Sequence, residues 1–498
     1  MPGRRRGTKL PAMTSVGDLG KAQGRAAPLW IAACSLAIVT ALAMLALQPP
    51  VNADVTWHLV MGRAAEAGAR YYQDVRDPNL PPIYWFAQAA DRLGTWTGYP
   101  AHGWYFLAAA LWLGGALLVL RPLLAELLPP ARAWLLLAGF AWIFAGVPGL
   151  HAGQRDHLAA IGLLPYLVAA ALPQRSSGAR RVVIALGVAA AVVLKPYYVG
   201  VPALVELWRL RGGLHGLRRS EALLAAPMTL LIVGTCLAVE PGYLDYLDRF
   251  GSLYALLPPA ALSWDAWALI ALLPATALLA LAQRCALSSA LLLGGCGALA
   301  VTALQNKWWD YHVLAPMLLL MAGLLAQVLQ PLRKTLAIAL AVLALPVLAW
   351  GALQSWRNLS VYQLHDSKAP FLAEVEGWIV AAGGSSARVA ILSGHVVDFM
   401  PAVYSSGAGW ALADPSLWQL AAYPRMEPPQ PAVQQAFLDE IVQRLASDPP
   451  QILGLQALGQ AGEPGSLFLA LPDFQALLSR YEPLGVQRQT RYWRLRAP

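Results

Sequence analysis

The sequence predicts a polytopic α-helical membrane protein that ends in a soluble α/β domain. Of the 498 residues, 58% are hydrophobic and 13% are charged, and the charges fall in short clusters between apolar runs. Several runs reach the roughly 18 residues that a helix needs to cross the hydrocarbon core. After about residue 354 the runs become shorter and alternate with polar segments. This composition is typical of membrane proteins.

The apolar runs predict eleven membrane crossings. The first run stays as an anchor, because QPPVNADV follows it directly and contains no small-residue cleavage pattern. The fifth and sixth runs are too short to cross singly, so one helical hairpin that turns at Lys195-Pro196 is an alternative. In chain order, the expected crossings are roughly 29 to 47, 104 to 120, 133 to 150, 158 to 173, 182 to 194, 197 to 208, 222 to 239, 264 to 282, 287 to 304, 312 to 329 and 335 to 351.

The basic residues predict how these crossings are oriented. Up to residue 354 the chain holds 26 Lys and Arg against 15 Asp and Glu, whereas the remainder holds 10 against 12. The positive-inside rule makes the basic segments cytoplasmic. Nucleic acid is not an expected partner, because binding it would need basic residues gathered on one soluble face. The segments assigned to the cytoplasm are the amino-terminal tail, the loops 121–132, 174–181 and 209–219, Arg284, and Arg333-Lys334.

Three parts of the chain follow from this topology. Residues 1–28 form a basic cytoplasmic tail, and residues 29–354 form the transmembrane part, with outer loops at 48–103 and 151–157. Residues 355–498 are expected to form a periplasmic or extracellular α/β domain. There SSARVAILSG is typical of a strand, AVQQAFLDEIVQRLASDPPQILGL of a helix and a strand, and LGVQRQTRYWRLR of an edge strand. The Ala, Leu and Arg richness indicates a bacterial source and hence the bacterial cytoplasmic (inner) membrane.

The first outer loop is one of three outward segments that concentrate polar side chains. It opens with NADVTWHL, where Asp54, Trp57 and His58 share one face if the segment is helical. Its alternating faces predict a helix that lies flat in the membrane interface. The alternative is that Asp54 only caps the helix. Asp74 and Asp77 are expected to belong to a turn, since Asp before Pro is ordinary loop chemistry.

The second segment, HAGQRDH, comes immediately before a crossing. Four neighbouring side chains that form hydrogen bonds are costly to bury at membrane depth without partners. A tight loop with a capping aspartate is the alternative interpretation. The four residues are Gln154, Arg155, Asp156 and His157.

The third segment, QNKWWDYHVLAP, combines aromatic and ionisable residues. Its tryptophans, Trp308 and Trp309, are typical of the interfacial aromatic belt. A belt does not account for the neighbouring Lys307, Asp310, Tyr311 and His312. Lys195 in LKPYY is a further signal, because a lysine inside an apolar stretch either snorkels outward or pairs with an anion. The turn at Pro196 frees backbone groups, which a membrane tolerates only where they line a cavity.

Taken in order, these features resemble the GT-C superfamily of integral-membrane glycosyltransferases, which use polyprenyl-phosphate-linked sugars as donors. The resemblance rests on Asp54 after the first crossing, on the loop GARYYQDVRDPNLPPIYW, on Asp156 in GQRDH, and on the outer carboxy-terminal domain. It implies a GT-C-like fold and transfer of a hexosyl or pentosyl group to an extracytoplasmic cell-envelope glycan, lipid or protein. Many relatives carry paired acids in the first outer loop, whereas this chain has Ala53-Asp54, so a divalent cation is only weakly supported.

The resemblance also implies roles for individual residues. Glycosyl transfer from a lipid phosphate needs a base for the acceptor hydroxyl and cations for the departing phosphate. Asp54 is expected to be the general base, and Asp156 a second catalytic residue that orients hydroxyls or completes a metal site with His157 and, as an uncertain third acid, Asp310. The expected substrate-binding residues are the phosphate ligands Arg155, Lys195 and Lys307, together with His157, Tyr311, His312 and His58.

Two other functions are compatible with the sequence. A transporter or flippase of lipid-linked sugars would also be a polytopic protein, but it would usually show related halves and ionisable residues at the bilayer midplane. A noncatalytic envelope scaffold would bind a glycan through tryptophans of its carboxy-terminal domain, although most tryptophans are buried. The tryptophans concerned are Trp378, Trp410, Trp418 and Trp493. Membrane lipids are partners in every case.

Overall fold

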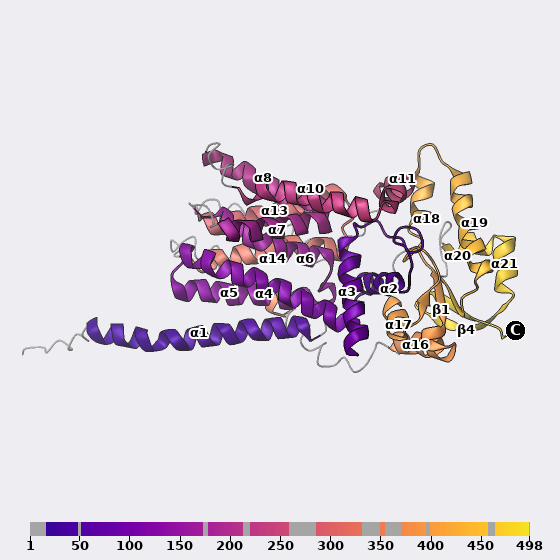
Figure 1. The fold of residues 1–498 in the computed structure, drawn as a ribbon, viewed down its shortest axis with the longest axis horizontal. Helices are drawn as coiled ribbons and strands as arrows, with labels where there is room; N and C mark the ends of the chain where they lie inside the picture. Colours follow the sequence, from indigo (N-terminus) through magenta and orange to yellow (C-terminus); the bar gives the residue numbers. More distant parts are fainter. Residues whose placement is uncertain are drawn as a thin grey trace, which may run out of the picture.

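The computed structural model consists of a helical bundle joined end to end with a mixed sheet and its helices (Figure 1). The bundle occupies the amino-terminal part of the chain and the sheet the carboxy-terminal part. The helices α2, α3 and α11 lie where the two parts meet. The structure describes residues 16–47, 51–172, 178–212, 220–257, 285–330, 349–353, 370–394, 399–456 and 464–497.

The bundle helices follow the apolar runs of the sequence. Helices occur at the predicted crossings that begin at residues 29, 104, 133, 158, 182, 222, 287 and 312, and the short run 197 to 208 forms a 3-10 turn followed by α8 (Gly200–Arg209). The predicted crossings at 264 to 282 and, except for its end, 335 to 351 lie outside the described residues. The total of eleven crossings therefore stays a prediction. The described bundle helices are α1 (Val16–Ala46), α4 (Ala101–Leu127), α5 (Pro130–Gly146), α6 (Arg155–Ala170), α7 (Gly178–Leu194), α8 (Gly200–Arg209), α10 (Glu221–Val239), α13 (Ala286–Gln305) and α14 (Asp310–Val328).

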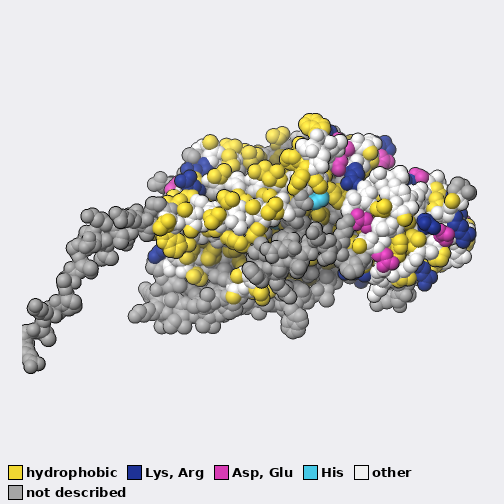
Figure 2. Space-filling view, turned by 90° about the horizontal axis from the view of Figure 1, so that it is seen from below, with side chains coloured by type: hydrophobic (Ala, Val, Ile, Leu, Met, Phe, Trp, Pro, Cys, Tyr) yellow, Lys and Arg dark blue, Asp and Glu magenta, His cyan; other side chains and the backbone are white. Residues whose placement is uncertain are grey.

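The bundle is the membrane part of a multi-pass membrane protein. Within the described ranges, five helical segments are long and apolar enough to cross a bilayer, while α5 is apolar but shorter. Figure 2 shows apolar side chains spread over the bundle, whereas charged side chains gather over the sheet end and at the far end of the bundle. The five segments are Leu29–Ala46, Ala101–Leu127, Glu221–Val239, Ala286–Gln305 and Tyr311–Val328.

Helix α6 forms the centre of the bundle. Its residues from Asp156 to Ala170 are all buried. Gly162 of α6 meets Gly187 of α7 so closely that a Cβ on either would lie 2.7 Å from the carbonyl oxygen of the other. Small residues permit such direct backbone contact between membrane helices. The contact fixes α6 against α7 and brings the start of α6 close to Lys195, which follows α7.

A five-stranded sheet forms the core of the carboxy-terminal part. Its order is β2-β1-β3-β5-β4, with β1 parallel to β2 and β3, and β5 antiparallel to β3 and β4. The strands are β1 (Arg388–Leu392), β2 (Gly409–Trp410), β3 (Ile452–Gln456), β4 (Tyr481–Gln487) and β5 (Thr490–Leu495), and the helices are α16 (Pro370–Ala381), α17 (Met400–Ser405), α18 (Gln419–Ala422), α19 (Pro431–Ser447), α20 (Pro464–Leu469) and α21 (Pro472–Leu478).

The strand expected in SSARVAILSG, and the helix and strand expected after it, correspond to β1, α19 and β3. The prediction of one edge strand in LGVQRQTRYWRLR was wrong. Arg488 and Gln489 both have positive φ angles, of 44° and 64°, and form the tight turn of a hairpin. The hairpin places β4 at the edge and β5 inside the sheet.

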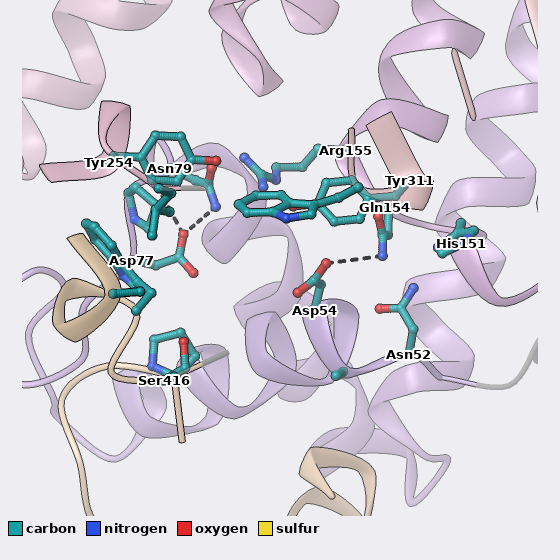
Figure 3. A pocket seen from close by; sticks show the side chains of 18 of the residues that line it. Asn52, Asp54, Asp77, Asn79, His151, Gln154, Arg155, Tyr254, Tyr311 and Ser416 are labelled. Atoms are coloured by element: carbon teal, nitrogen blue, oxygen red, sulfur yellow. Dashed lines mark hydrogen bonds between the residues drawn. The ribbon is translucent and has the colours of Figure 1, made fainter. Parts of the chain in front are cut away.

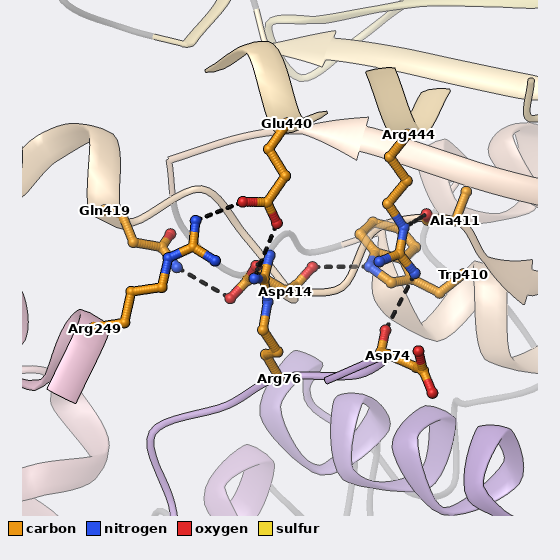
Figure 4. Close-up of polar contacts among 9 residues, drawn as sticks. All are labelled: Asp74, Arg76, Arg249, Trp410, Ala411, Asp414, Gln419, Glu440 and Arg444. Atoms are coloured by element: carbon orange, nitrogen blue, oxygen red, sulfur yellow. Dashed lines mark hydrogen bonds and ion pairs between the residues drawn. The ribbon is translucent and has the colours of Figure 1, made fainter. Parts of the chain in front are cut away.

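A network of ion pairs fastens the two parts together (Figure 4). Arg76, in the loop between α2 (Ala53–Glu66) and α3 (Pro82–Thr97), binds Asp414 through Nη2 at 2.7 Å and Glu440 through Nη1 at 3.1 Å. Arg249 of α11 (Gly242–Ala255) reaches Glu440 at 2.5 Å. Because the Arg76–Asp414 pair is buried, it holds the next residue of the loop, Asp77, at a fixed place under the sheet.

Candidate active site

A cavity of about 670 Å³ lies where the bundle meets the sheet part (Figure 3). It mixes apolar walls with a few converging polar groups, as small-molecule sites usually do. Its polar lining residues include Asn52, Asp54, Asp77, Asn79, His151, Gln154, Arg155, Tyr311, Ser416 and Gln456, and its apolar or aromatic ones include Leu150, Tyr254, Leu257, Trp309, Pro415 and Trp418.

Asp54 lies in the first turn of α2 and projects into the cavity. The alternative that Asp54 caps this helix is wrong, because Asn52 is the cap: its Oδ1 accepts a hydrogen bond from the backbone N–H of Val55 at 2.8 Å. The Asp54 carboxylate instead accepts a hydrogen bond from Gln154 Nε2 at 3.2 Å. Burial raises the pKa of Asp54 to about 6, against the opposing effect of the Arg155 charge. The carboxylate is therefore more basic than an ordinary aspartate and still mostly ionised at pH 7.

Helix α2 is an internal helix, and the prediction that it lies flat in the membrane interface was wrong. Its residues from Val55 to Gly62 are all buried. Trp57 packs edge-on against Trp410 of β2, with ring centroids 6.3 Å apart. His58 is 2% exposed, lies 5.6 Å from the ring of Tyr84 and does not line the cavity. The helix is buried because α3 packs along it and α17 and β2 of the sheet part cover it.

Asp77 is a second carboxylate in the same cavity. The sequence interpretation, which assigned Asp77 to an ordinary turn, did not predict this position. The Tyr84 hydroxyl donates a hydrogen bond to Asp77 Oδ1 at 2.6 Å. Asn79 donates to the same oxygen through its backbone N–H at 3.2 Å and through its side-chain amide. Burial raises the pKa of Asp77, while Arg155 opposes the shift. No local sequence pattern marks Asp77 as a site residue, because only tertiary packing brings it beside Asp54.

Arg155, the first residue of α6, supplies the positive charge of the cavity. Figure 3 shows its side chain between those of Asp77 and Tyr311. Its guanidinium forms no hydrogen bond or ion pair with another residue in the described part of the chain, although its charge acts on both Asp54 and Asp77. A guanidinium in this state has donors left for a bidentate anion such as a phosphate.

Asp156 and Lys195 form a closed pair beside the cavity. Lys195 Nζ binds the two carboxylate oxygens of Asp156 at 2.7 and 2.8 Å, and the Tyr198 hydroxyl donates to Asp156 at 2.5 Å. The sequence left two alternatives for Lys195, snorkelling outward or pairing with an anion. The structure shows the pairing, with Asp156 as the anion. Neither Asp156 nor Lys195 is among the lining residues, and both are buried.

The third polar segment contributes Trp309 and Tyr311 to the cavity wall. The interpretation of Trp309 as a belt residue was therefore wrong. Lys307 lies behind the wall, where its Nζ donates to the backbone oxygen of Leu257 at 2.8 Å. His312 is 1% exposed and packs edge-on against Tyr311, with ring centroids 4.6 Å apart. Substrate contacts by Lys307 and His312 stay predictions.

The sheet part closes the cavity with the carboxyl ends of its parallel strands. Gly394 follows β1, and Gln456 ends β3. The Gln456 Oε1 accepts hydrogen bonds from the Ser393 hydroxyl at 2.6 Å and from the Gly394 backbone N–H at 3.3 Å. Trp418 adds an aromatic surface. Ligands of α/β sheets commonly bind at this strand end.

The oxygen donors of the cavity are those that a hard divalent cation prefers. The carboxylates of Asp54 and Asp77 and the amide oxygens of nearby Asn and Gln side chains are the residues that could hold one. His157 is less suited, because its Nδ1 accepts a hydrogen bond from Gly153 at 3.0 Å and its Nε2 donates to the Phe144 oxygen at 2.6 Å. No group of three or more His, Cys, Asp or Glu side chains with metal-binding geometry occurs among the residues that the structure covers.

Comparisons with known proteins identify the fold. The sequence matches no protein-family model and no curated protein. ArnT from Cupriavidus metallidurans, solved bound to undecaprenyl phosphate, matches 94% of this chain and 97% of its own, with a TM-score of 0.57 and 12% identity. The arabinofuranosyltransferase AftD from mycobacteria aligns with 93% of this chain and 40% of its own, with a TM-score of 0.48 and 14% identity.

The oligosaccharyltransferase of Archaeoglobus fulgidus aligns with 77% of this chain and 64% of its own, with a TM-score of 0.41 and 10% identity. At these identities the likeness to ArnT concerns the fold. The chain shares this fold along almost its whole length, from the membrane helices to the sheet part. The resemblance stated from the sequence is thereby confirmed for the fold, which this chain shares with ArnT.

Proposed function

We propose that this protein is a glycosyltransferase that moves a sugar from a polyprenyl-phosphate-linked donor to an extracytoplasmic cell-envelope acceptor. The observation that carries the proposal is the cavity in which the basic carboxylate of Asp54 and the unpaired guanidinium of Arg155 lie together. The fold of ArnT, which was solved with undecaprenyl phosphate, supports a lipid-phosphate donor. The site thus combines a proton acceptor with an anion ligand.

In this reaction Asp54 accepts the proton of the acceptor hydroxyl while the hydroxyl oxygen attacks the anomeric carbon of the donor sugar. The bond between that carbon and the phosphate oxygen breaks, and the polyprenyl phosphate leaves with the electron pair. Arg155 stabilises the negative charge that develops on the phosphate. Attack from the face opposite the leaving phosphate inverts the anomeric configuration.

Asp77, Asn79 and Gln154 provide hydrogen-bonding groups for the sugar hydroxyls, because they line the cavity around Asp54. The closed Asp156–Lys195 pair positions Arg155, because Asp156 follows Arg155 in the sequence and is fixed by Lys195. The two charges of the pair neutralise each other. A catalytic role of Asp156 and a phosphate-binding role of Lys195 would require this pair to open. Arg155 is therefore the phosphate ligand in this proposal.

The cavity faces the extracytoplasmic side, with the amino terminus in the cytoplasm and the sheet part in the periplasm of a bacterial inner membrane. The support is the charge pattern. Helices α4 and α8 both end at the bundle end opposite α2 and α3 (Figure 1), and the predicted basic segments that begin at Arg121 and Arg209 start in the carboxy-terminal parts of these two helices. A donor carried by a membrane lipid then reaches the cavity from the outer leaflet, and the acceptor comes from the envelope.

The transporter and scaffold alternatives receive less support. A transporter would be expected to concentrate ionisable groups at the bilayer midplane, whereas Asp54, Asp77 and Arg155 line one cavity near α2, where the bundle meets the sheet part. A glycan-binding scaffold would present exposed tryptophans, whereas Trp493 is 8% exposed, Trp378 and Trp410 are partly buried, and Trp418, 8% exposed, lines the cavity beside Asp54. Transfer by an active-site carboxylate accounts for the cavity more completely.

The test is the Asp54→Asn variant in membranes supplied with radiolabelled undecaprenyl-phosphate-linked sugars, one sugar at a time. Transfer to membrane or envelope material should fall by roughly 10²- to 10⁴-fold, the usual contribution of a general base. Folding should be undisturbed, because the substitution removes a charge that is costly to bury. The matched control is Asp74→Asn in the same outer loop, where the carboxylate is exposed and should be dispensable. Unchanged transfer by Asp54→Asn would eliminate the proposed base.

A further inference from the structure

A second cavity, of about 1120 Å³, adjoins the first. Both cavities are lined by Asn52, Ala53 and Leu150, so they meet at the start of α2. Asp54 directly follows Asn52 and Ala53 in the sequence, and its side chain projects into the first cavity. The walls of the second cavity come from α2, from the α3–α4 corner, and from α16 and α17, which lie side by side at the junction of the two parts (Figure 1).

One wall of the second cavity is an arginine sandwiched between acidic and aromatic partners. Arg63 Nε lies 3.6 Å from Asp91 Oδ1, and the guanidinium stacks on the Tyr404 ring at 4.7 Å from its centroid. Arg63 also donates to the backbone oxygen of Tyr404 at 3.3 Å. The Tyr404 hydroxyl accepts a hydrogen bond from the backbone N–H of His102 at 3.1 Å. These contacts fix the polar groups in place before a ligand arrives.

Another part of the lining repeats this combination. Arg488, at the tip of the β4–β5 hairpin, lies 3.7 Å above the ring of Phe371, and Glu376 of α16 lines the same space. Tyr99 of the α3–α4 corner is 44% exposed and adds another aromatic surface. The cavity thus presents carboxylates, guanidiniums and aromatic rings with no excess of either charge.

We propose that this second cavity binds the saccharide part of the acceptor, so that the acceptor is a glycan. Sugar hydroxyls both donate and accept hydrogen bonds, which suits carboxylates and guanidiniums arranged together. The apolar faces of sugar rings pack on aromatic side chains. A lipid chain alone would desolvate the Arg63–Asp91 pair and the Glu376 carboxylate without offering them a hydrogen bond. The inference rests on the proposed function and deepens it by naming the class of acceptor.

The placement of Asp54 agrees with this assignment. A base must reach the acceptor hydroxyl while the leaving phosphate lies on the other side of the anomeric carbon. Asp54 and Arg155 both line the first cavity only, and the second cavity adjoins the first at Asn52 and Ala53, the two residues that precede Asp54. An acceptor sugar in the second cavity would therefore present a hydroxyl to Asp54, opposite the phosphate bound by Arg155.

The test measures ligand protection of a cysteine placed in the second cavity. Ser405 lines this cavity and is exposed, so Ser405→Cys in the full chain, reconstituted in phosphatidylethanolamine and phosphatidylglycerol vesicles, should react with a membrane-impermeant maleimide. Two probes are compared: free disaccharides such as maltose and cellobiose, and diglucosyl diacylglycerol included in the vesicles. A probe present at about ten times its Kd should slow labelling by about tenfold. Protection by the free sugars indicates a soluble glycan, and protection by the glycolipid alone indicates a lipid-borne one.

Matched variants separate binding from folding and from transfer. Glu376→Gln should weaken protection by roughly tenfold, the size of a hydrogen bond to a charged group, whereas Glu374→Gln on the same helix, which lies outside the cavity, should not. Protection should persist with Asp54→Asn, so the absence of transfer leaves this result intact. Ser447→Cys, on the exposed side of α19, should be labelled at the same rate with and without sugar. Labelling of Ser405→Cys that no saccharide slows, or equal protection in Glu376→Gln, would overturn the proposal.

Discussion

Asp54 and Asp156 are carboxylates at the starts of two neighbouring helices, but their surroundings are opposite. Asp156 is bound by the Lys195 ammonium at 2.7 and 2.8 Å and by the Tyr198 hydroxyl at 2.5 Å. Asp54 accepts its hydrogen bond from a neutral amide, that of Gln154, at 3.2 Å. The adjacent Arg155 likewise has no ion-pair partner in the described part of the chain.

The difference separates charges that hold the fold from charges available to a ligand. A closed pair in a low-dielectric interior satisfies itself, and breaking it strands a buried charge. A carboxylate and a guanidinium that line one cavity without binding each other keep their capacity for a substrate. The proposal therefore gives Asp156 and Lys195 the task of holding the fold, and Asp54 and Arg155 that of binding substrate.

The largest expected effect concerns the closed pair. Asp156→Asn should lower the free energy of unfolding by about 3–5 kcal/mol, because it leaves Lys195 charged and buried without its anion. The double variant Asp156→Asn/Lys195→Met should recover most of this loss. Equilibrium unfolding in mixed detergent micelles measures both. If the single variant were as stable as the native protein, the pair would not have the structural role given to it.

Arg155→Gln sharpens the comparison from the other side. Sugar transfer should fall by roughly 10²- to 10³-fold, as for the loss of one preorganised donor to a developing negative charge. Stability should not fall, since Arg155 has no ion pair to lose. The readouts are the rate of transfer from undecaprenyl-phosphate-linked sugar and the unfolding midpoint, with the exposed Arg92→Gln as the control. A destabilised but fully active Arg155→Gln protein would reverse the assignment.

The pH dependence of transfer should show the titration of Asp54. Because the pKa of Asp54 is raised to about 6, the base loses its ionised form as the pH falls through that value. Transfer should then fall about tenfold per pH unit below pH 6. The unfolded chain has the lower pKa, near 3.8, so ionisation costs folding stability as the pH rises from about 4 to 6.

The smallest expected effect is that of the neighbouring carboxylate on this titration. The negative charge of Asp77 helps to raise the pKa of Asp54. Asp77→Asn should therefore shift the acid limb of the rate profile to lower pH, by less than about one unit. The pH profiles of the variant and the native protein measure the shift. A limb that moves to higher pH would mean that the titrating group is not Asp54.

The sequence predicted the parts of the site that depend on local pattern. Asp54 and Arg155 follow or precede long apolar runs, and such runs place the residues at the membrane surface. The pairing of Lys195 with an anion was one of the two alternatives that its apolar surroundings predicted. Helices also occupy most of the predicted crossings within the described residues, because long apolar runs mark them.

The remaining features depend on packing between distant segments. Asp77 enters the cavity because Arg76 is anchored to Asp414 of the sheet part, a contact that no local pattern encodes. The closing wall at Gly394 and Gln456 depends on how the strands pair. Helix α2 has the alternation of an interfacial helix, yet the sheet part covers it. The positions of Asp77, the closing wall and α2 therefore depend on tertiary contacts, which the periodicity of the sequence does not encode.

The central claim is that the unpaired Arg155 binds the phosphate of the lipid donor, whereas the paired Lys195 does not. Equilibrium binding of undecaprenyl phosphate to the purified full chain in nanodiscs tests it most directly. Binding should weaken by at least about tenfold in Arg155→Gln and stay close to the native value in Asp156→Asn/Lys195→Met. Native affinity in Arg155→Gln, with affinity lost in the double variant, would contradict the account.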